Sequence, residues 1–148
     1  MKAVIQRVKW ARVLVEDGIL AHISKGILVL LCVEKGDNEK TIDWMVDKLL
    51  NLRIFPDDEG KLNRSIKDVG GEILLVSNFT VCGELKKGTR PSFHLAEEPS
   101  KAQNILEEMR RRLADRGVSV KTGLFGAHME VELLNDGPVT LVLDRSLD

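Results

Sequence analysis

Residues 26–33 have the sequence Gly-Ile-Leu-Val-Leu-Leu-Cys-Val, which is an unbroken apolar run. Such a run is typical of a strand that is buried on both faces. The chain before it alternates apolar and polar side chains, as strands with one solvated face do. The alternating stretches are residues 2–8, 12–16 and 19–23. Glu16-Asp17-Gly18 has the composition of a hairpin turn, so this third of the chain is predicted to be β-sheet.

Two later segments change to the helical period. Between residues 38 and 51, apolar side chains recur at intervals of three and four, which predicts a helix with one apolar face and Asp37 or Asn38 as its N-cap. A second helix with a similar stripe ends at Gly117. The two stripes are Ile42, Met45, Val46, Leu49 and Leu50, and Ala102, Ile105, Leu106, Met109 and Leu113.

Further strands are predicted at residues 72–79, 118–122, 128–134 and 139–143. Neither helix is placed as a regular βαβ crossover. We therefore expect a single α+β domain over residues 1–148. Its antiparallel or mixed β-sheets would form a sandwich or barrel-like core with the two helices packed on one side.

Composition and charge narrow the protein class. The 148 residues are 43% hydrophobic, and 22 Lys and Arg against 23 Asp and Glu give a net charge of −1. A chain of this length can fold without disulfides or metals, and its apolar runs are too short to span a membrane. We expect a cytoplasmic protein without membrane contact, in which Cys32 and Cys82 are free thiols. The near-neutral charge argues against indiscriminate nucleic-acid binding but permits a local basic patch.

Familiar catalytic motifs are missing from the sequence. His22, His94 and His128 are far apart and form no metal-binding pair, and there is no G-x-S-x-G or phosphate-binding glycine motif. We therefore predict no metal and no cofactor. The run Arg110-Arg111-Arg112 has acidic neighbours and is interpreted as a solvated helix face with ion pairs.

Two short stretches stand out as candidate functional motifs. Ser77-Asn78-Phe79-Thr80 places polar groups at the end of a buried strand, where they can face a ligand. Asn135-Asp136-Gly137-Pro138-Val139-Thr140 contains strong turn residues, and its spacing alone predicts a hairpin loop.

Together with other segments, these two stretches resemble the signature motifs of the D-aminoacyl-tRNA deacylase family. The resemblance extends over essentially the whole chain and keeps the family's order. The matching segments are residues 3–8, 26–33, 52–55, 68–72, 77–80, 88–93, 122–127 and 135–140.

The resemblance implies an ester hydrolase that releases D-amino acids, and also mischarged glycine, from the 3′ end of tRNA as a proofreading step. It implies a homodimer in which a cis Gly137-Pro138 bond of one subunit enters the active site of the other. There its carbonyl oxygens would capture the substrate ammonium and leave no room for an L side chain. The implied catalytic residues are Ser77, Phe79 and Thr80, and the implied substrate-binding residues are Asn78, Gly137, Pro138, Met129, Phe125 and Arg7.

One departure from the family pattern affects the first motif. Asn78 stands where the family usually has glutamine, and Cys82-Gly83-Glu84 replaces an aromatic-Ala-Asp continuation. Two mechanisms stay open: Thr80 acts as nucleophile or proton carrier, or the 2′-hydroxyl of the tRNA assists while backbone N–H groups near Phe79 and Thr80 stabilise the oxyanion. The second is favoured because no base accompanies the threonine.

Lys86, Lys87 and Arg90 follow the first motif and are candidate tRNA contacts, although a solvated loop would have the same composition. Two alternative functions also remain at this point. One is a non-catalytic module that binds RNA ends with the same fold, and the other is an esterase that acts on small D-aminoacyl esters.

Overall fold

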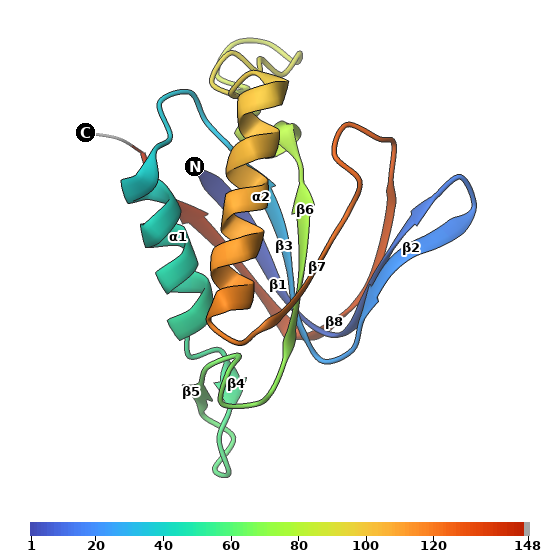
Figure 1. Ribbon diagram of the computed structural model, residues 1–148, viewed down its shortest axis with the longest axis vertical. Coiled ribbons are helices and arrows are strands. Elements are labelled where there is room, and N and C mark those ends of the chain that lie inside the picture. The colour runs from blue at the N-terminus through green and yellow to red at the C-terminus, as the bar shows by residue number, and fades with distance from the viewer. Residues whose placement is uncertain (147–148) are drawn as a thin grey trace.

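A computed structural model describes residues 1–146, which form a mixed six-stranded sheet and two α-helices (Figure 1). The order of hydrogen-bonded strands is β2-β1-β3-β6-β7. β3 and β2 pair with the first and second halves of β1, and β8 pairs with β1 over nearly its whole length. These strands are β1 (Lys2–Val15), β2 (Gly18–Ile23), β3 (Gly26–Cys32), β6 (Glu72–Ser77), β7 (Ser119–Thr122) and β8 (Glu130–Asp144). The sheet curls until it is nearly closed into a barrel, which confirms the predicted α+β class.

β3 is the buried strand predicted from the apolar run, and it lies between β1 and β6. It runs antiparallel to β1 but parallel to β6, and β6 runs parallel to β7. The helix α1 (Glu39–Asn51) connects β3 to β6, and α2 (Pro99–Asp115) connects β6 to β7. Both helices are therefore crossovers between parallel neighbours, so the expectation of no regular βαβ crossover is wrong. The short hairpin β4 (Phe55–Pro56) and β5 (Leu62–Arg64) and the long loop before α2 obscure this pattern in the sequence.

Both helices cover the same face of the sheet, as predicted (Figure 1). Asn38 caps α1, because its side chain accepts hydrogen bonds from the backbone N–H groups of Lys40 and Thr41. The Thr41 hydroxyl accepts in return from the Asn38 N–H, which completes a capping box. The apolar stripes of both helices pack on the sheet in the larger core, and a smaller core lies on its opposite face.

The strands β1 and β8 are each longer than predicted. β1 continues through the expected gap at residues 9–11. β8 pairs with β1 on both sides of the Gly-Pro segment, from Val8↔Asn135 to Gln6↔Thr140. Residues 136–139 are therefore a wide bulge opposite the single residue Arg7, and the predicted hairpin loop at this place is wrong. The Gly137-Pro138 peptide bond within the bulge is cis.

Cys32 and Cys82 form a disulfide, so the expectation of free thiols is wrong. Cys32 ends β3, and Cys82 ends η1 (Phe79–Cys82), the 3₁₀ turn that follows β6. Because β3 and β6 are parallel neighbours, the chain that leaves β6 passes over the end of β3, and the two Cα atoms lie 6.0 Å apart. Sequence spacing did not show this proximity, because fifty residues separate the two cysteines.

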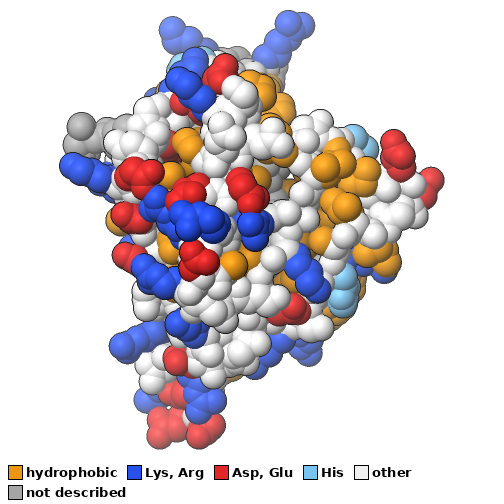
Figure 2. All heavy atoms as spheres, viewed as in Figure 1, with side chains coloured by type: hydrophobic (Ala, Val, Ile, Leu, Met, Phe, Trp, Pro, Cys, Tyr) orange, Lys and Arg blue, Asp and Glu red, His pale blue; other side chains and the backbone are white. Residues whose placement is uncertain are grey.

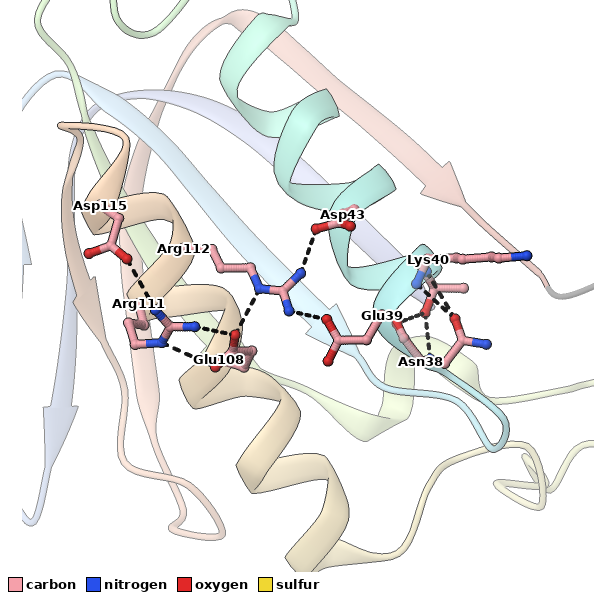
Figure 3. A network of polar contacts seen from close by, with 9 residues as sticks. Asn38, Glu39, Lys40, Asp43, Glu108, Arg111, Arg112 and Asp115 are labelled. Atoms are coloured by element: carbon pink, nitrogen blue, oxygen red, sulfur yellow. Dashed lines mark hydrogen bonds and ion pairs between the residues drawn. The ribbon is translucent and has the colours of Figure 1, made fainter.

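The arginine run on α2 forms the predicted ion pairs. The Arg112 guanidinium bridges the helices by contacting Glu39 and Asp43 on α1 and Glu108 on its own helix (Figure 3). Hydrogen bonds from Arg111 and Arg112 lower the pKa of Glu108 to about 2. Figure 2 shows acidic and basic side chains interleaved over this face. Within residues 1–146, no helix is long and apolar enough to cross a membrane.

Candidate active site

A pocket of about 950 Å³ opens at the carboxyl ends of β3 and β6. Parallel strands end at the same edge of a sheet. Residues from the beginning of α2 and from the loop between β7 and β8 complete the lining of the pocket, and Figure 1 shows where these elements lie. The structure brings together six of the predicted site residues in this pocket. They are Ser77, Asn78, Phe79, Thr80, Phe125 and Met129.

The first motif is shaped by the side chain of Asn78. Its Oδ1 atom accepts hydrogen bonds from the backbone N–H of Thr80 at 3.3 Å and from the Thr80 hydroxyl at 2.5 Å. Asn78 is thus the N-cap of η1 and also orients the hydroxyl of Thr80. An amide oxygen is not a base, so this contact does not activate Thr80 as a nucleophile. The lone pairs of the Thr80 oxygen stay available as acceptors.

Phe79 forms an aromatic wall at the mouth of the pocket. Its side chain is 57% exposed, which is unusual for phenylalanine and leaves a ring surface free for a planar or apolar ligand. Phe93 packs edge-to-face against it, with ring centroids 5.0 Å apart and an angle of 81° between the rings. Phe93 also lines the pocket, a role that its position in the sequence did not indicate.

Other lining residues were also missed. His128 is an exposed lining residue that directly precedes Met129, and Cys32 lines the pocket from the end of β3. A lone histidine in a predicted strand gave no signal of this position. Glu98 is a further lining residue, and a hydrogen bond from the Ser100 hydroxyl lowers the pKa of its carboxyl group. It is thus held in its ionised form at neutral pH. In the described part of the chain, no three His, Cys, Asp or Glu residues are grouped to hold a metal ion.

The second motif lies away from the pocket of its own chain. Gly137 and Pro138 are in the bulge opposite Arg7, which pairs with Ile27 at the beginning of β3, whereas the pocket is at the end of that strand. Leu31 lies four positions after Ile27, which corresponds to about 13 Å along a strand. The structure therefore does not bring the two motifs together within one chain.

Arg7 anchors the bulge of its own chain. Its side chain is buried; Nε donates to the Asp136 carbonyl oxygen at 2.9 Å, and Nη1 donates to the Ile54 carbonyl oxygen at 2.7 Å. Gly137 has φ +147°, and a Cβ there would lie 2.8 Å from the backbone nitrogen of Val139. The segment thus fits against Arg7 with no room for a side chain at Gly137.

The predicted tRNA contacts are on the exposed loop between η1 and α2. Lys86, Lys87 and Arg90 do not line the pocket, but their loop begins directly after η1. Lys86 lies 3.7 Å from Glu84, which bridges to Ser92 across the base of the loop. Basic side chains project from this loop at the top of Figure 2.

Comparison with known proteins identifies the family of this chain. The family model described as D-Tyr-tRNA(Tyr) deacylase matches residues 4–144. The D-aminoacyl-tRNA deacylase of Clostridioides difficile (strain 630) is 51% identical, covering 99% of this chain and 98% of that protein. The D-aminoacyl-tRNA deacylase of Magnetococcus marinus is 52% identical, covering 97% of this chain and 96% of that protein.

Two solved structures have the same fold. The structure of a c-Myc DNA unwinding element binding protein has a TM-score of 0.94 and 41% sequence identity, and the match covers 99% of this chain and 100% of that one. A probable eukaryotic D-amino acid tRNA deacylase has a TM-score of 0.83 at 18% identity over 97% of this chain and 98% of its own, which shows the fold alone. Given the family model and the full-length relatives, the chain belongs to the D-Tyr-tRNA(Tyr) deacylase family.

Proposed function

We propose that this protein hydrolyses the ester bond of D-aminoacyl-tRNA in the cytoplasm, releasing the D-amino acid and tRNA. The observation that carries the proposal is the pocket at the ends of β3 and β6, which collects Ser77, Asn78, Phe79 and Thr80 in a member of a deacylase family. Glycine has no side chain to exclude, so mischarged glycyl-tRNA is included as a second substrate.

The active enzyme in this proposal is a homodimer. Gly137 and Pro138 belong to the site by resemblance, yet they lie near the opposite end of β3 from the pocket of their own chain. In a two-fold dimer each subunit can supply this bulge to the pocket of the other. The carbonyl oxygens of the bulge would then accept hydrogen bonds from the substrate ammonium and reject an L side chain by steric exclusion.

The geometry of Thr80 favours the mechanism in which the substrate RNA assists. The hydroxyl proton of Thr80 is directed at the Asn78 amide oxygen, which cannot accept it permanently. In the proposed step, water adds to the ester carbonyl carbon while the terminal 2′-hydroxyl relays a proton to the departing 3′-oxygen. The Phe79 N–H begins η1 and therefore has no acceptor within that turn, so it can stabilise the oxyanion. One such donor is worth about 3 kcal/mol of transition-state stabilisation.

One assay tests the proposal. The protein is incubated with matched D- and L-aminoacyl-tRNA, with glycyl-tRNA, and with a D-aminoacyl ester that lacks RNA. We expect rapid loss of the D-aminoacyl-tRNA and glycyl-tRNA, and persistence of the L-aminoacyl-tRNA and the small ester. Equal cleavage of the small ester would indicate a general esterase instead. Binding of tRNA without cleavage would indicate the non-catalytic module that binds RNA ends.

Two changes separate the proposed mechanisms. A substrate ending in 2′-deoxyadenosine should resist cleavage, whereas Thr80→Ala should lower the rate without abolishing it. Full activity on the deoxy substrate would refute the RNA-assisted route. Complete inactivity of a folded Thr80→Ala variant would instead assign the proton transfer to Thr80.

A further inference from the structure

The disulfide is placed where it can influence the proposed active site. Cys82 is the last residue of η1, the turn that carries Phe79 and Thr80. Cys32 is the last residue of β3 and lines the pocket itself. Both side chains are buried within the chain, at 1% exposure for Cys32 and 0% for Cys82. The covalent link therefore joins the rigid sheet to the segment that presents the first motif.

Few other connections hold η1 against the sheet. Within residues 1–146, a single backbone hydrogen bond joins residues 78–83 to another element, from the Asn78 N–H to the Leu31 carbonyl oxygen at 2.8 Å. The remaining backbone bonds of the segment, Val81 to Asn78 and Gly83 to Thr80, are internal. The disulfide thus fixes the end of a turn whose beginning is held by one hydrogen bond.

Reduction of the bond would move η1 and leave the sheet in place. Two thiol sulfur atoms cannot remain at bonding distance, so one cysteine must shift. Cys32 pairs with Lys2 of β1, and the residue before it, Leu31, pairs with Ser77 of β6, so Cys32 is held by the sheet. Cys82 belongs to a four-residue turn next to the exposed loop at residues 83–90. The displacement falls on η1 and therefore on Phe79 and Thr80.

We propose that Cys32 and Cys82 are a reversible redox modification site that controls deacylation by setting the position of η1. In the reductive step, a dithiol transfers two electrons and two protons to the Cys32–Cys82 bond; this yields two cysteine thiols, and the dithiol becomes its own disulfide. An oxidising low-molecular-weight disulfide reverses the step and leaves as two thiols. Because both cysteines are buried, such a reagent reaches the bond only when η1 opens beside the pocket that Cys32 lines, and a single backbone hydrogen bond to the sheet opposes this opening. The inference rests on the proposed function for its catalytic consequence.

The test compares two states of the whole protein, one treated with oxidised glutathione and one with dithiothreitol, each freed of reagent. Thiol titration after denaturation should find no thiol in the first and both cysteines in the second. Hydrogen–deuterium exchange of peptides over residues 77–84 should be faster in the reduced state, while exchange over β3 stays the same. Since misplacing catalytic groups by about 1 Å can cost up to about 100-fold in rate, we expect reduction to lower kcat/KM for D-aminoacyl-tRNA roughly tenfold.

Cys32→Ala and Cys82→Ala serve as matched variants, because each removes the same bond from a different side. Both should reproduce the kcat/KM and the exchange of the reduced wild-type protein, and neither should respond to dithiothreitol. Free thiols in the oxidised sample, or equal exchange over residues 77–84 in both states, would overturn the inference whatever the activity. A change in exchange with equal kcat/KM would overturn its catalytic part. A change in exchange in a protein that cleaves no D-aminoacyl-tRNA in either state would refute the proposed function and leave the redox site standing.

Discussion

Replacing Arg7 by methionine tests whether the buried Arg7 side chain holds the Gly-Pro bulge in place or contributes no more than an exposed ion pair does. Methionine replaces the apolar stem of arginine but lacks its guanidinium group. The variant therefore loses the two donors to the Asp136 and Ile54 carbonyl oxygens, at 2.9 and 2.7 Å. The bulge would then lose its side-chain anchor to Arg7 and, through it, to the segment after α1, while its flanks stay paired with β1. The change therefore affects stability and the position of Gly137 together.

The expected loss of stability follows from these two hydrogen bonds. A hydrogen bond from a charged donor contributes about 1.5–3 kcal/mol, and the buried acceptors would be left without these partners. The two bonds of Arg7 together predict a loss of about 3–6 kcal/mol in the free energy of unfolding. For a chain of this size, each kcal/mol lowers the Tm by about 2–4 °C, so the Tm should fall by about 10 °C.

The matched control is Arg12→Met on the same strand. Arg12 pairs with Glu132 at 2.9 Å, but the two side chains are open to solvent, with exposed fractions of 34% and 43%. Exposed ion pairs contribute about 0–1 kcal/mol, so this variant should unfold almost as the wild type does. Both variants are unfolded in urea at one protein concentration, because stability of a dimer depends on concentration. Cleavage of D-aminoacyl-tRNA is measured well below the Tm of each.

We expect Arg7→Met to lose at least about tenfold in kcat/KM, since displaced binding groups have effects of this order, and Arg12→Met to retain its activity. If the unfolding free energies of Arg7→Met and Arg12→Met differed by less than about 1 kcal/mol, the reasoning would be refuted. The buried hydrogen bonds of Arg7 would then contribute no more than an exposed ion pair does. A destabilised variant with unchanged kcat/KM would leave Arg7 a purely structural residue.

Three further predictions concern other parts of the molecule. Pro138→Ala should raise KM for D-aminoacyl-tRNA; unchanged kinetics would remove Pro138 from substrate selection. Charge reversal of Lys86 and Lys87 to glutamate should weaken tRNA binding and make its logarithmic salt dependence shallower by about 0.7–0.9 for each phosphate that is no longer neutralised, and an unaltered slope would place the tRNA elsewhere. The pKa of Glu108 is lowered from 4.5 to about 2 in the folded protein, so its stabilising contribution is complete above pH 4.5 and disappears toward pH 2. Thermal scans should therefore show Glu108→Gln less stable than the wild type at pH 6, with the difference shrinking as the pH falls.

Local patterns predicted the parts of the fold that depend on neighbouring residues. The N-cap Asn38 and the apolar stripe of α1 act within a few residues, and β3 owes its burial to its own side chains. The parallel pairing of β3 with β6 was not predicted, because it depends on how the intervening helix returns the chain to the sheet. The same nonlocal pairing brings Cys32 to Cys82, which explains why the free thiols expected from composition were wrong.

In the candidate site, too, the features set by neighbouring residues were predicted and the nonlocal ones were not. The first motif was recognised because Ser77 to Thr80 are consecutive and follow a buried strand. Phe93 and His128 reach the pocket from separate loops, so no spacing in the sequence could mark them. The Gly-Pro segment was expected to form a hairpin because its residues favour turns. Its two flanks, however, both pair with β1 rather than with each other.

This pairing of β8 ties the length of the Gly-Pro segment to the alternation of side chains along the strand. Both flanks are bound to the same 14-residue β1, so the chain cannot gain or lose one residue between them by lengthening a free loop. A deletion within residues 136–139 that the bulge did not absorb would shift one flank by one position and turn its inward side chains outward. Engineering of this segment is thereby limited to replacement of side chains, since insertions and deletions would disturb the whole strand.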